Sequence, residues 1–80
     1  MSRRIYSPRP VSVRADTGDR PLAVGRHDVE AIREQWLVED RWWTARPVRR
    51  SYFELTTAEG ANRVVFRDLV SERWFAQRGA

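Results

Sequence analysis

The sequence contains no cysteine and no lysine, and it has one histidine. Without cysteine the chain has no disulfide framework and no cysteine-ligated zinc, and this absence fits a reducing compartment. No apolar run approaches the ~20 residues that span a bilayer. No apolar segment follows the basic residues 1–4, as a signal peptide would require. We therefore expect a cytoplasmic protein that does not enter a membrane.

Patterns for catalysis and metal binding are also missing. His27 is the single histidine, and no serine has the glycine-flanked spacing of a nucleophile elbow. Asp16 and Asp19 flank Gly18 without the full spacing of a calcium loop. No glycine-rich phosphate loop occurs, and a chain of 80 residues forms one domain with a thin core. We expect a non-enzymatic protein that uses no cofactor and no metal.

All fifteen basic residues are arginine, and the formal net charge is +4. GC-rich coding favours arginine codons and explains this bias without any function. The alternative is phosphate binding, because the guanidinium fork matches phosphate oxygens. Residues 1–10 include Arg3, Arg4 and Arg9 and no acid, so they are predicted to form a flexible basic arm. The single β domain is expected at 11–80.

Short alternating apolar segments separated by turn residues predict a mainly β domain. One hairpin is expected around the turn at 16–19 and a second around Glu59 and Gly60. In the second hairpin, the side chains of 53 and 55 are expected to share a face with those of 64 and 66. The segments that show this pattern are 11–13, 22–24, 52–57, 64–66 and 74–77. They indicate an antiparallel meander of five or six strands, arranged as a sheet or half-barrel.

The segment 28–38 fits two structures. Val29, Ile32 and Trp36 have helical spacing, and Asp28 is a suitable N-cap. As a strand, the same segment places Ile32 and Trp36 on one face. The residues alone leave this open, and one helical turn near 28–34 is the alternative to a strand.

The aromatic residues suggest a binding site. Trp36 and Trp74 lie inside apolar segments and are expected in the core. Adjacent side chains of an extended backbone point to opposite faces, so one ring of the Trp42–Trp43 pair should be exposed. The surrounding segment 39–50 is expected to be a loop, with no acid between its first and last arginine. The candidate contact residues are Arg41, Trp42, Trp43, Arg46, Arg49 and Arg50.

Three interpretations of these candidate contact residues remain open. Arginine beside exposed aromatics is typical of a surface that stacks single-stranded nucleic acid. It is equally typical of a protein-binding hot spot. A solvated loop with one buried tryptophan is the third interpretation, and the spacing does not separate them.

Four motifs resemble known proteins: Trp36–Trp43, Pro47–Phe53, Val65–Leu69 and Arg73–Arg78. Over about 11–78 the chain is similar to a family of short actinobacterial proteins of unknown function. More distantly, and only over about 36–77, it resembles the C-terminal segment of inactive Y-family DNA polymerase homologues of the bacterial mutagenesis cassette. Those segments share a Trp-Trp pair, an Arg-aromatic-aromatic strand, a hydrophobic strand ending near Asp, and a Trp-aromatic end.

The resemblance has three implications. It favours a strand over 28–38, because the related segments are β-hairpin modules. It implies an accessory module of DNA repair or translesion synthesis whose partner is a DNA polymerase homologue or another repair protein. Direct binding of single-stranded nucleic acid is the alternative. The relatives often have Gly where this chain has Glu72, so this turn is expected to differ in type.

Overall fold

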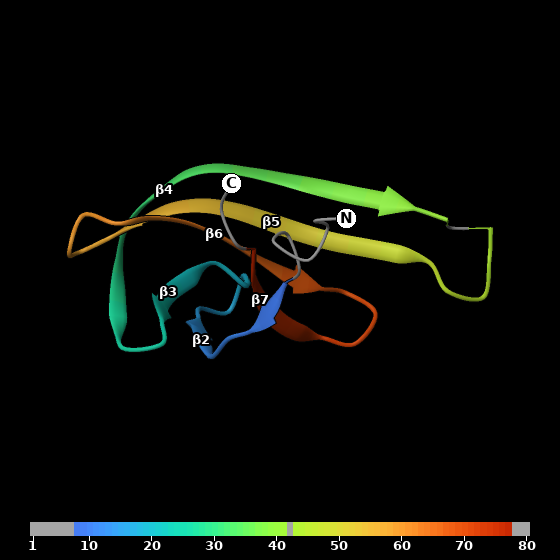
Figure 1. The fold of residues 1–80 in the computed structure, drawn as a ribbon, viewed down its shortest axis with the longest axis horizontal. Coiled ribbons are helices and arrows are strands. Elements are labelled where there is room, and N and C mark those ends of the chain that lie inside the picture. The colour runs from blue at the N-terminus through green and yellow to red at the C-terminus, as the bar shows by residue number, and fades with distance from the viewer. Residues whose placement is uncertain (1–7, 42, 78–80) are drawn as a thin grey trace, which may run out of the picture.

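The computed structural model describes residues 8–41 and 43–77. Those residues form one antiparallel sheet that curls into a half-barrel (Figure 1), as the alternating pattern predicted. They contain no helix, and therefore none that could cross a membrane. The sheet order is β1-β7-β6-β5-β4-β3-β2. The strands are β1 (Arg9–Pro10), β2 (Val13–Ala15), β3 (Pro21–Val24), β4 (His27–Asp40), β5 (Val48–Thr57), β6 (Asn62–Asp68) and β7 (Arg73–Gln77).

The sheet begins before the boundary expected from the sequence. Arg9 and Pro10 form β1, which pairs with Ala76 and Phe75 of β7. Proline is tolerated here because β1 is an edge strand. The remainder of the predicted arm, residues 1–7, lies outside the described residues.

Strand β4 replaces the alternative of a helical turn near 28–34. The spacing of Val29 and Ile32 resembles a helix because β4 contains bulges. The ladder with β5 shifts between Val29 and Ala31 and again between Ile32 and Glu34. A bulge inserts one extra residue, so Val29 and Ile32 both pack against the core although they are three residues apart.

The β5–β6 register differs by one residue from the face expected for this hairpin. Phe53 lies opposite Val65, and Tyr52 lies opposite Phe66. The turn sets this register, because the Thr57 N–H bonds to the carbonyl of Ala61 across a three-residue loop. A slip of one residue moves side chains to the opposite face of a sheet. The sequence-based grouping of residues 53 and 55 with 64 and 66 was therefore wrong.

One face of the sheet, the core face, carries the buried Phe53, Leu55 and Val65. Trp74 also packs against this cluster, with its ring centroid 5.8 Å from that of Phe53, as expected for a core tryptophan. The β2–β3 hairpin covers this face because β4 bends sharply near its start (Figure 1) and carries β3 beneath the sheet. Val24 of β3 completes the buried cluster.

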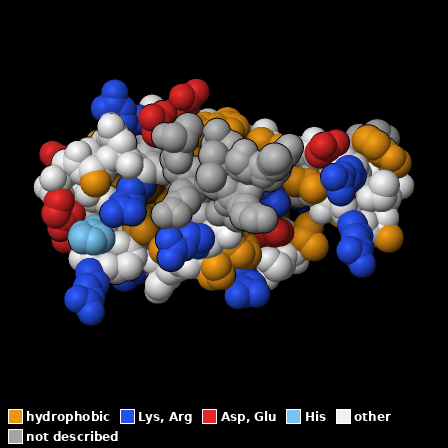
Figure 2. Space-filling model, viewed as in Figure 1, with side chains coloured by type: hydrophobic (Ala, Val, Ile, Leu, Met, Phe, Trp, Pro, Cys, Tyr) orange, Lys and Arg blue, Asp and Glu red, His pale blue; other side chains and the backbone are white. Residues whose placement is uncertain are grey.

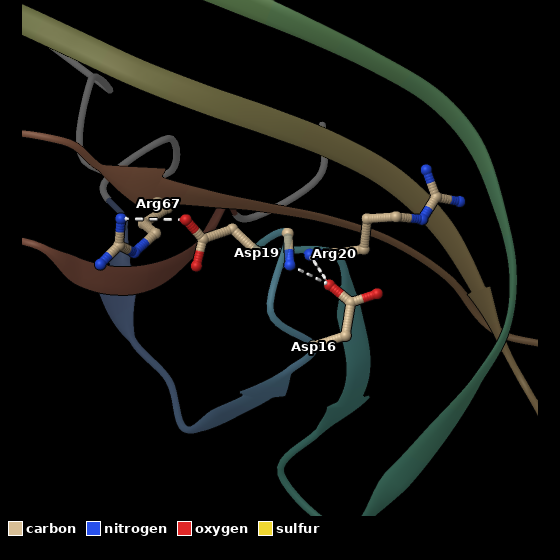
Figure 3. A network of polar contacts seen from close by, with 5 residues as sticks. Asp16, Asp19, Arg20 and Arg67 are labelled. Carbon is tan, nitrogen blue, oxygen red and sulfur yellow. Dashed lines mark hydrogen bonds and ion pairs between the residues drawn. The ribbon is translucent and has the colours of Figure 1, made fainter.

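The turn of the β2–β3 hairpin is tied both to itself and to the sheet (Figure 3). Asp16 accepts backbone hydrogen bonds from Gly18 at 2.8 Å and from Arg20 at 3.0 Å. These bonds, led by the one from Arg20, lower the pKa of the Asp16 carboxyl. Asp19 forms an ion pair with Arg67 of β6 at 3.5 Å. This ion pair joins the covering hairpin to the core face.

The turn before β7 contains Glu72, where the sequence predicted a different turn type from that of the relatives with glycine. This residue has φ of 63°, so it adopts the left-handed conformation that glycine adopts freely. The expected change of turn type was therefore wrong at this residue. The Asp68 side chain holds the turn, because its Oδ1 accepts hydrogen bonds from the N–H groups of Val70 and Ser71.

Candidate binding face

Opposite the core face, four neighbouring strands each contribute one ring to a continuous row. Trp36 of β4 lies opposite Tyr52 of β5, which lies opposite Phe66 of β6, which lies opposite Phe75 of β7. Residues directly opposite each other in an antiparallel ladder share a face. We call these four side chains the aromatic row, and the side of the sheet that carries them the aromatic face.

The rings of the aromatic row are in contact along its whole length. Trp36 and Tyr52 are stacked, with centroids 5.3 Å apart and planes 8° from parallel. Tyr52 and Phe66 are 4.8 Å apart, and Phe66 and Phe75 are 5.3 Å apart. Such pairs add stability beyond the area they bury. The row is therefore a rigid surface built across strands that are far apart in sequence.

Accessibility varies along the aromatic row. Trp36, at the β4 end, is 37% exposed, so the structure contradicts its predicted place in the core. Tyr52 and Phe75 are half-buried. Phe66 is only 1% exposed. The row therefore presents Trp36 most openly.

Two arginines cover the row from one side. The guanidinium carbon of Arg50 lies 4.6 Å from the ring centroid of Phe66, and that of Arg73 lies 5.8 Å from Phe75. These are cation–π distances. Arg50 also donates from Nη1 to the Tyr52 hydroxyl at 3.2 Å. Its Nε is buried and has no hydrogen-bond partner in the described part of the chain.

The two sides of the aromatic row differ in charge. On one side, register places Arg50 opposite Asp68 and Asp68 opposite Arg73. On the other side, Glu34 lies opposite Glu54. The row therefore separates an arginine-containing side from an acidic side on the same face.

A shallow hollow of about 160 Å³ lies on the acidic side. Arg63 and Ala76 line it together with Glu54, Val64 and Gln77, and the last three occupy register positions directly beside the aromatic row. Asn62 lies at the end of the same hollow, where its Oδ1 accepts from Thr56. Carboxylate and amide groups are the groups that recognise the hydrogen-bonding edges of bases.

The structure divides the sequence-predicted site residues among three places. Arg49 and Arg50 belong to β5 rather than to a loop, and as neighbours in a strand they point to opposite faces. Arg49 lies on the core-face side and pairs with Glu39 at 3.1 Å. Only Arg50 reaches the aromatic face. Because Glu39 pairs with Arg49, this segment is also less positive than its sequence suggested.

Three more of the predicted residues, Arg41, Trp43 and Arg46, lie in the loop between β4 and β5. Trp43 is 65% exposed. Thr44 holds this loop, because its hydroxyl donates to the Arg41 carbonyl and accepts from the Arg46 N–H. Figure 2 shows arginine and hydrophobic side chains side by side at this end of the molecule. Trp42 lies outside the described residues.

The rest of the aromatic row was missed because sequence alone does not give register. Tyr52 and Phe75 stand beside Phe53 and Trp74, which point to the core. Only the pairing across four strands shows that Tyr52 and Phe75 lie in the same row. The sequence did carry one signal of a second aromatic face. Both β5 and β7 contain two adjacent aromatic residues, which must point to opposite faces of the sheet.

The histidine lies at the start of β4, nine residues before Trp36. His27 Nδ1 is 3.1 Å from Glu59 Oε2, and both side chains are exposed. The hydrogen bond from His27 is the main cause that lowers the pKa of Glu59. Within residues 8–41 and 43–77, no group of three or more His, Cys, Asp or Glu side chains is placed to hold a metal ion.

Comparisons with protein-family models, with curated proteins and with solved structures found no match to this chain.

Proposed function

We propose that this chain is a non-catalytic binding module that holds single-stranded nucleic acid on its aromatic face. The observation that supports this proposal is the aromatic row with Arg50 and Arg73 on one side and, on the other, a hollow whose lining includes Glu54, Asn62 and Gln77. Aromatic side chains on a sheet stack bases of any sequence, because every base has a π face. A non-enzymatic binding role also agrees with the expectation from the sequence.

The charge difference across the row gives the ligand an orientation. The backbone phosphates would lie on the side of Arg50 and Arg73, whose guanidinium groups already lie over the rings. Guanidinium planes also stack on bases, so Arg50 extends the stacking surface above the buried Phe66. The base edges would point toward Glu54 and the hollow. Each stacked base contributes ~1–3 kcal/mol.

The direct experiment is a fluorescence anisotropy titration with labelled oligothymidine of about 12 nucleotides, within the ~4–16 that comparable sheets cover. Trp36→Ala should weaken binding by about tenfold, because it removes the most exposed ring. Leu22→Ala is the matched control: Leu22 is 40% exposed, similar to Trp36, but lies on β3. If both variants bind equally well, the aromatic row is not the site.

Two adjacent arginines test the electrostatic part of the proposal. Arg50 lies on the aromatic face and Arg49 on the other. Arg50→Gln should reduce the slope of log affinity against log salt by ~0.7, the value for one contact to a single-strand phosphate. Arg49→Gln should leave the slope unchanged. Equal reductions of the slope in both variants would mean that binding depends on the overall positive charge and not on the aromatic face.

The loop residues Arg41, Trp43 and Arg46 fit this proposal as a second contact. They follow the end of β4, which carries Trp36 five residues earlier than Arg41. At ~3.3 Å per strand residue, a ligand of several nucleotides is long enough to reach both. A role in DNA repair, with a polymerase homologue as partner, stays a prediction from the sequence resemblance.

A further inference from the structure

Strand β4 has a long unpaired edge. Its edge toward β3 is paired only at His27 and Asp28, which lie opposite Val24 and Ala23. From Val29 to the end of β4, no described strand lies on that side. Figure 1 shows this part of β4 as the outermost long strand of the molecule. An unpaired edge is a template for another strand.

The backbone groups that face this edge follow from the β5 ladder. The Thr57 N–H bonds to Ala61, and the Leu69 N–H bonds to the carbonyl of Arg49. Odd-numbered residues of β5 therefore direct their backbone groups to β6, and even-numbered residues direct theirs to β4. Trp36 and Val38 lie opposite even-numbered residues, so they bond to β5. Their neighbours, Gln35, Leu37 and Glu39, direct their N–H and C=O groups outward.

Large apolar side chains gather on the same stretch of edge. Leu37 is 56% exposed and Trp36 is 37% exposed. They are adjacent in β4 and therefore point to opposite faces of the sheet. A strand added to this edge would cover both, one on each face.

Charge determines which antiparallel pairing of two β4 edges is favourable. A two-fold axis at residue 34 would place Glu34 opposite its own copy. An axis at residue 37 would place Glu34 opposite Asp40. Like charges directly opposite each other destabilise a sheet. Acidic residues therefore disfavour these registers, which is specificity by repulsion.

A two-fold axis at residue 36 has no such conflict. It places Glu34 opposite Val38 of the second copy, so Glu34 does not face another acid. Gln35 and Leu37 then face each other, and both direct their backbone groups outward. The axis also places each Trp36 opposite its copy, so the two aromatic rows become one.

We infer that two copies of this chain pair antiparallel along residues 32–40 of β4, with Trp36 opposite Trp36 of the second copy. The pairing places the exposed Trp36 and Leu37 beside side chains of the second copy, and it joins two seven-stranded sheets through one ladder. The resulting aromatic face is twice as long as that of one copy. This inference does not rest on the proposed function, because self-association needs no nucleic acid.

The first test is sedimentation velocity of the full chain across a concentration series. The mass should double from the monomer value of 9.5 kDa as the concentration rises. Trp36→Arg and Trp36→Glu should each stay monomeric, because each places two like charges at the axis. An equimolar mixture of the two variants should recover the doubled mass. Such recovery requires residue 36 to face its own copy.

The second test uses amide hydrogen exchange on the wild-type chain and so does not depend on the folding of variants. The amides of Leu37 and Glu39 should exchange more slowly at high protein concentration than at low concentration. Those of Trp36 and Val38, which bond to β5 in either state, serve as the internal control.

Three results would overturn the inference: a wild-type chain that stays monomeric throughout, a mixture of charged variants that does not associate, or protection that is independent of concentration. A monomeric chain with concentration-independent protection at Leu37 and Glu39 would instead assign the edge to another segment. None of these results would affect the test with oligothymidine on a monomer.

Discussion

The two faces of the sheet carry similar aromatic residues, which form the core on one face and the aromatic row on the other. On β5 and β7, aromatic residues stand side by side: Tyr52 with Phe53, and Trp74 with Phe75. One member of each pair packs into the core, and the other joins the aromatic row. The difference lies in what covers each face. The β2–β3 hairpin covers the core face, whereas arginine side chains lie over the aromatic face.

This comparison shows that an aromatic residue in a strand does not by itself indicate a core. In a sheet with a single covering layer, side chains of one parity are buried by the fold, and those of the other parity depend on each other. The aromatic row is stable because its rings contact one another across strands. Its surface is therefore formed by the fold itself.

The largest expected difference between the faces is in stability. Leu55→Ala on the core face should lower the free energy of unfolding by ~2–5 kcal/mol, because Leu55 is fully buried. Trp36→Ala should cost less, because Trp36 is 37% exposed; its pair with Tyr52 accounts for ~0.5–1.5 kcal/mol of the loss. Urea unfolding at low protein concentration measures both. Equal losses would mean that both faces are core.

The aromatic row should also show energetic coupling between strands. A double-mutant cycle on Trp36 and Tyr52, with leucine as the replacement, should give a coupling of ~0.5–1.5 kcal/mol. The next pair along the same two strands, Leu37 and Ser51, each replaced by alanine, is the control and should give a coupling near zero. If the cycle gives no coupling for Trp36 and Tyr52, the stacking of their rings does not stabilise the fold.

The turn before β7 offers a change that should leave both faces intact. Glu72→Gly should raise the free energy of unfolding by up to about 1 kcal/mol, because it relieves a left-handed conformation that costs non-glycine residues ~1–2 kcal/mol. Ser71→Gly in the same turn should instead destabilise the chain. Thermal unfolding checks both, and oligothymidine affinity should not change in either. If the Glu72→Gly variant is less stable than the wild type, the left-handed conformation of Glu72 is not strained.

The smallest expected effect concerns acid. Two backbone hydrogen bonds lower the pKa of Asp16 from its ordinary value of 3.8. A group whose folded pKa is lowered contributes stability above its unfolded pKa and loses it as the pH falls through the folded one. Asp16→Asn keeps an oxygen acceptor but does not titrate. Below pH 4, the wild type should therefore lose more melting temperature than Asp16→Asn. If the curves of melting temperature against pH are parallel for the two proteins, the ionised Asp16 carboxylate does not stabilise the fold.

The sequence predicts much of the fold because turns and alternation act locally. The first hairpin and the strand at the C-terminal end were confirmed within a few residues. In β4, local pattern was insufficient, because two bulges mix strand periodicity with helical spacing at Val29 and Ile32. The resemblance favoured a strand there, and the structure has one.

The candidate site was harder to predict because it depends on pairing across the sheet. Trp36 belongs to the aromatic face because the β4–β5 register places it opposite Tyr52, and Phe66 joins it because the turn at Thr57 and Ala61 fixes the β5–β6 register. The sequence places Arg49 and Arg50 together, whereas the strand separates them. Register depends on contacts between distant segments, and a single sequence records it only indirectly.

The bulges in β4 have a consequence for how the gene can change length. Between Val29 and Glu34, β4 has two more residues than the stretch of β5 opposite. Loss of a codon for Glu30 or Arg33 would therefore remove an unpaired residue and leave the ladder beyond it in place. Loss of a codon at Gln35 would shift every later side chain of β4 to the other face. Viable deletions should thus cluster at the bulges.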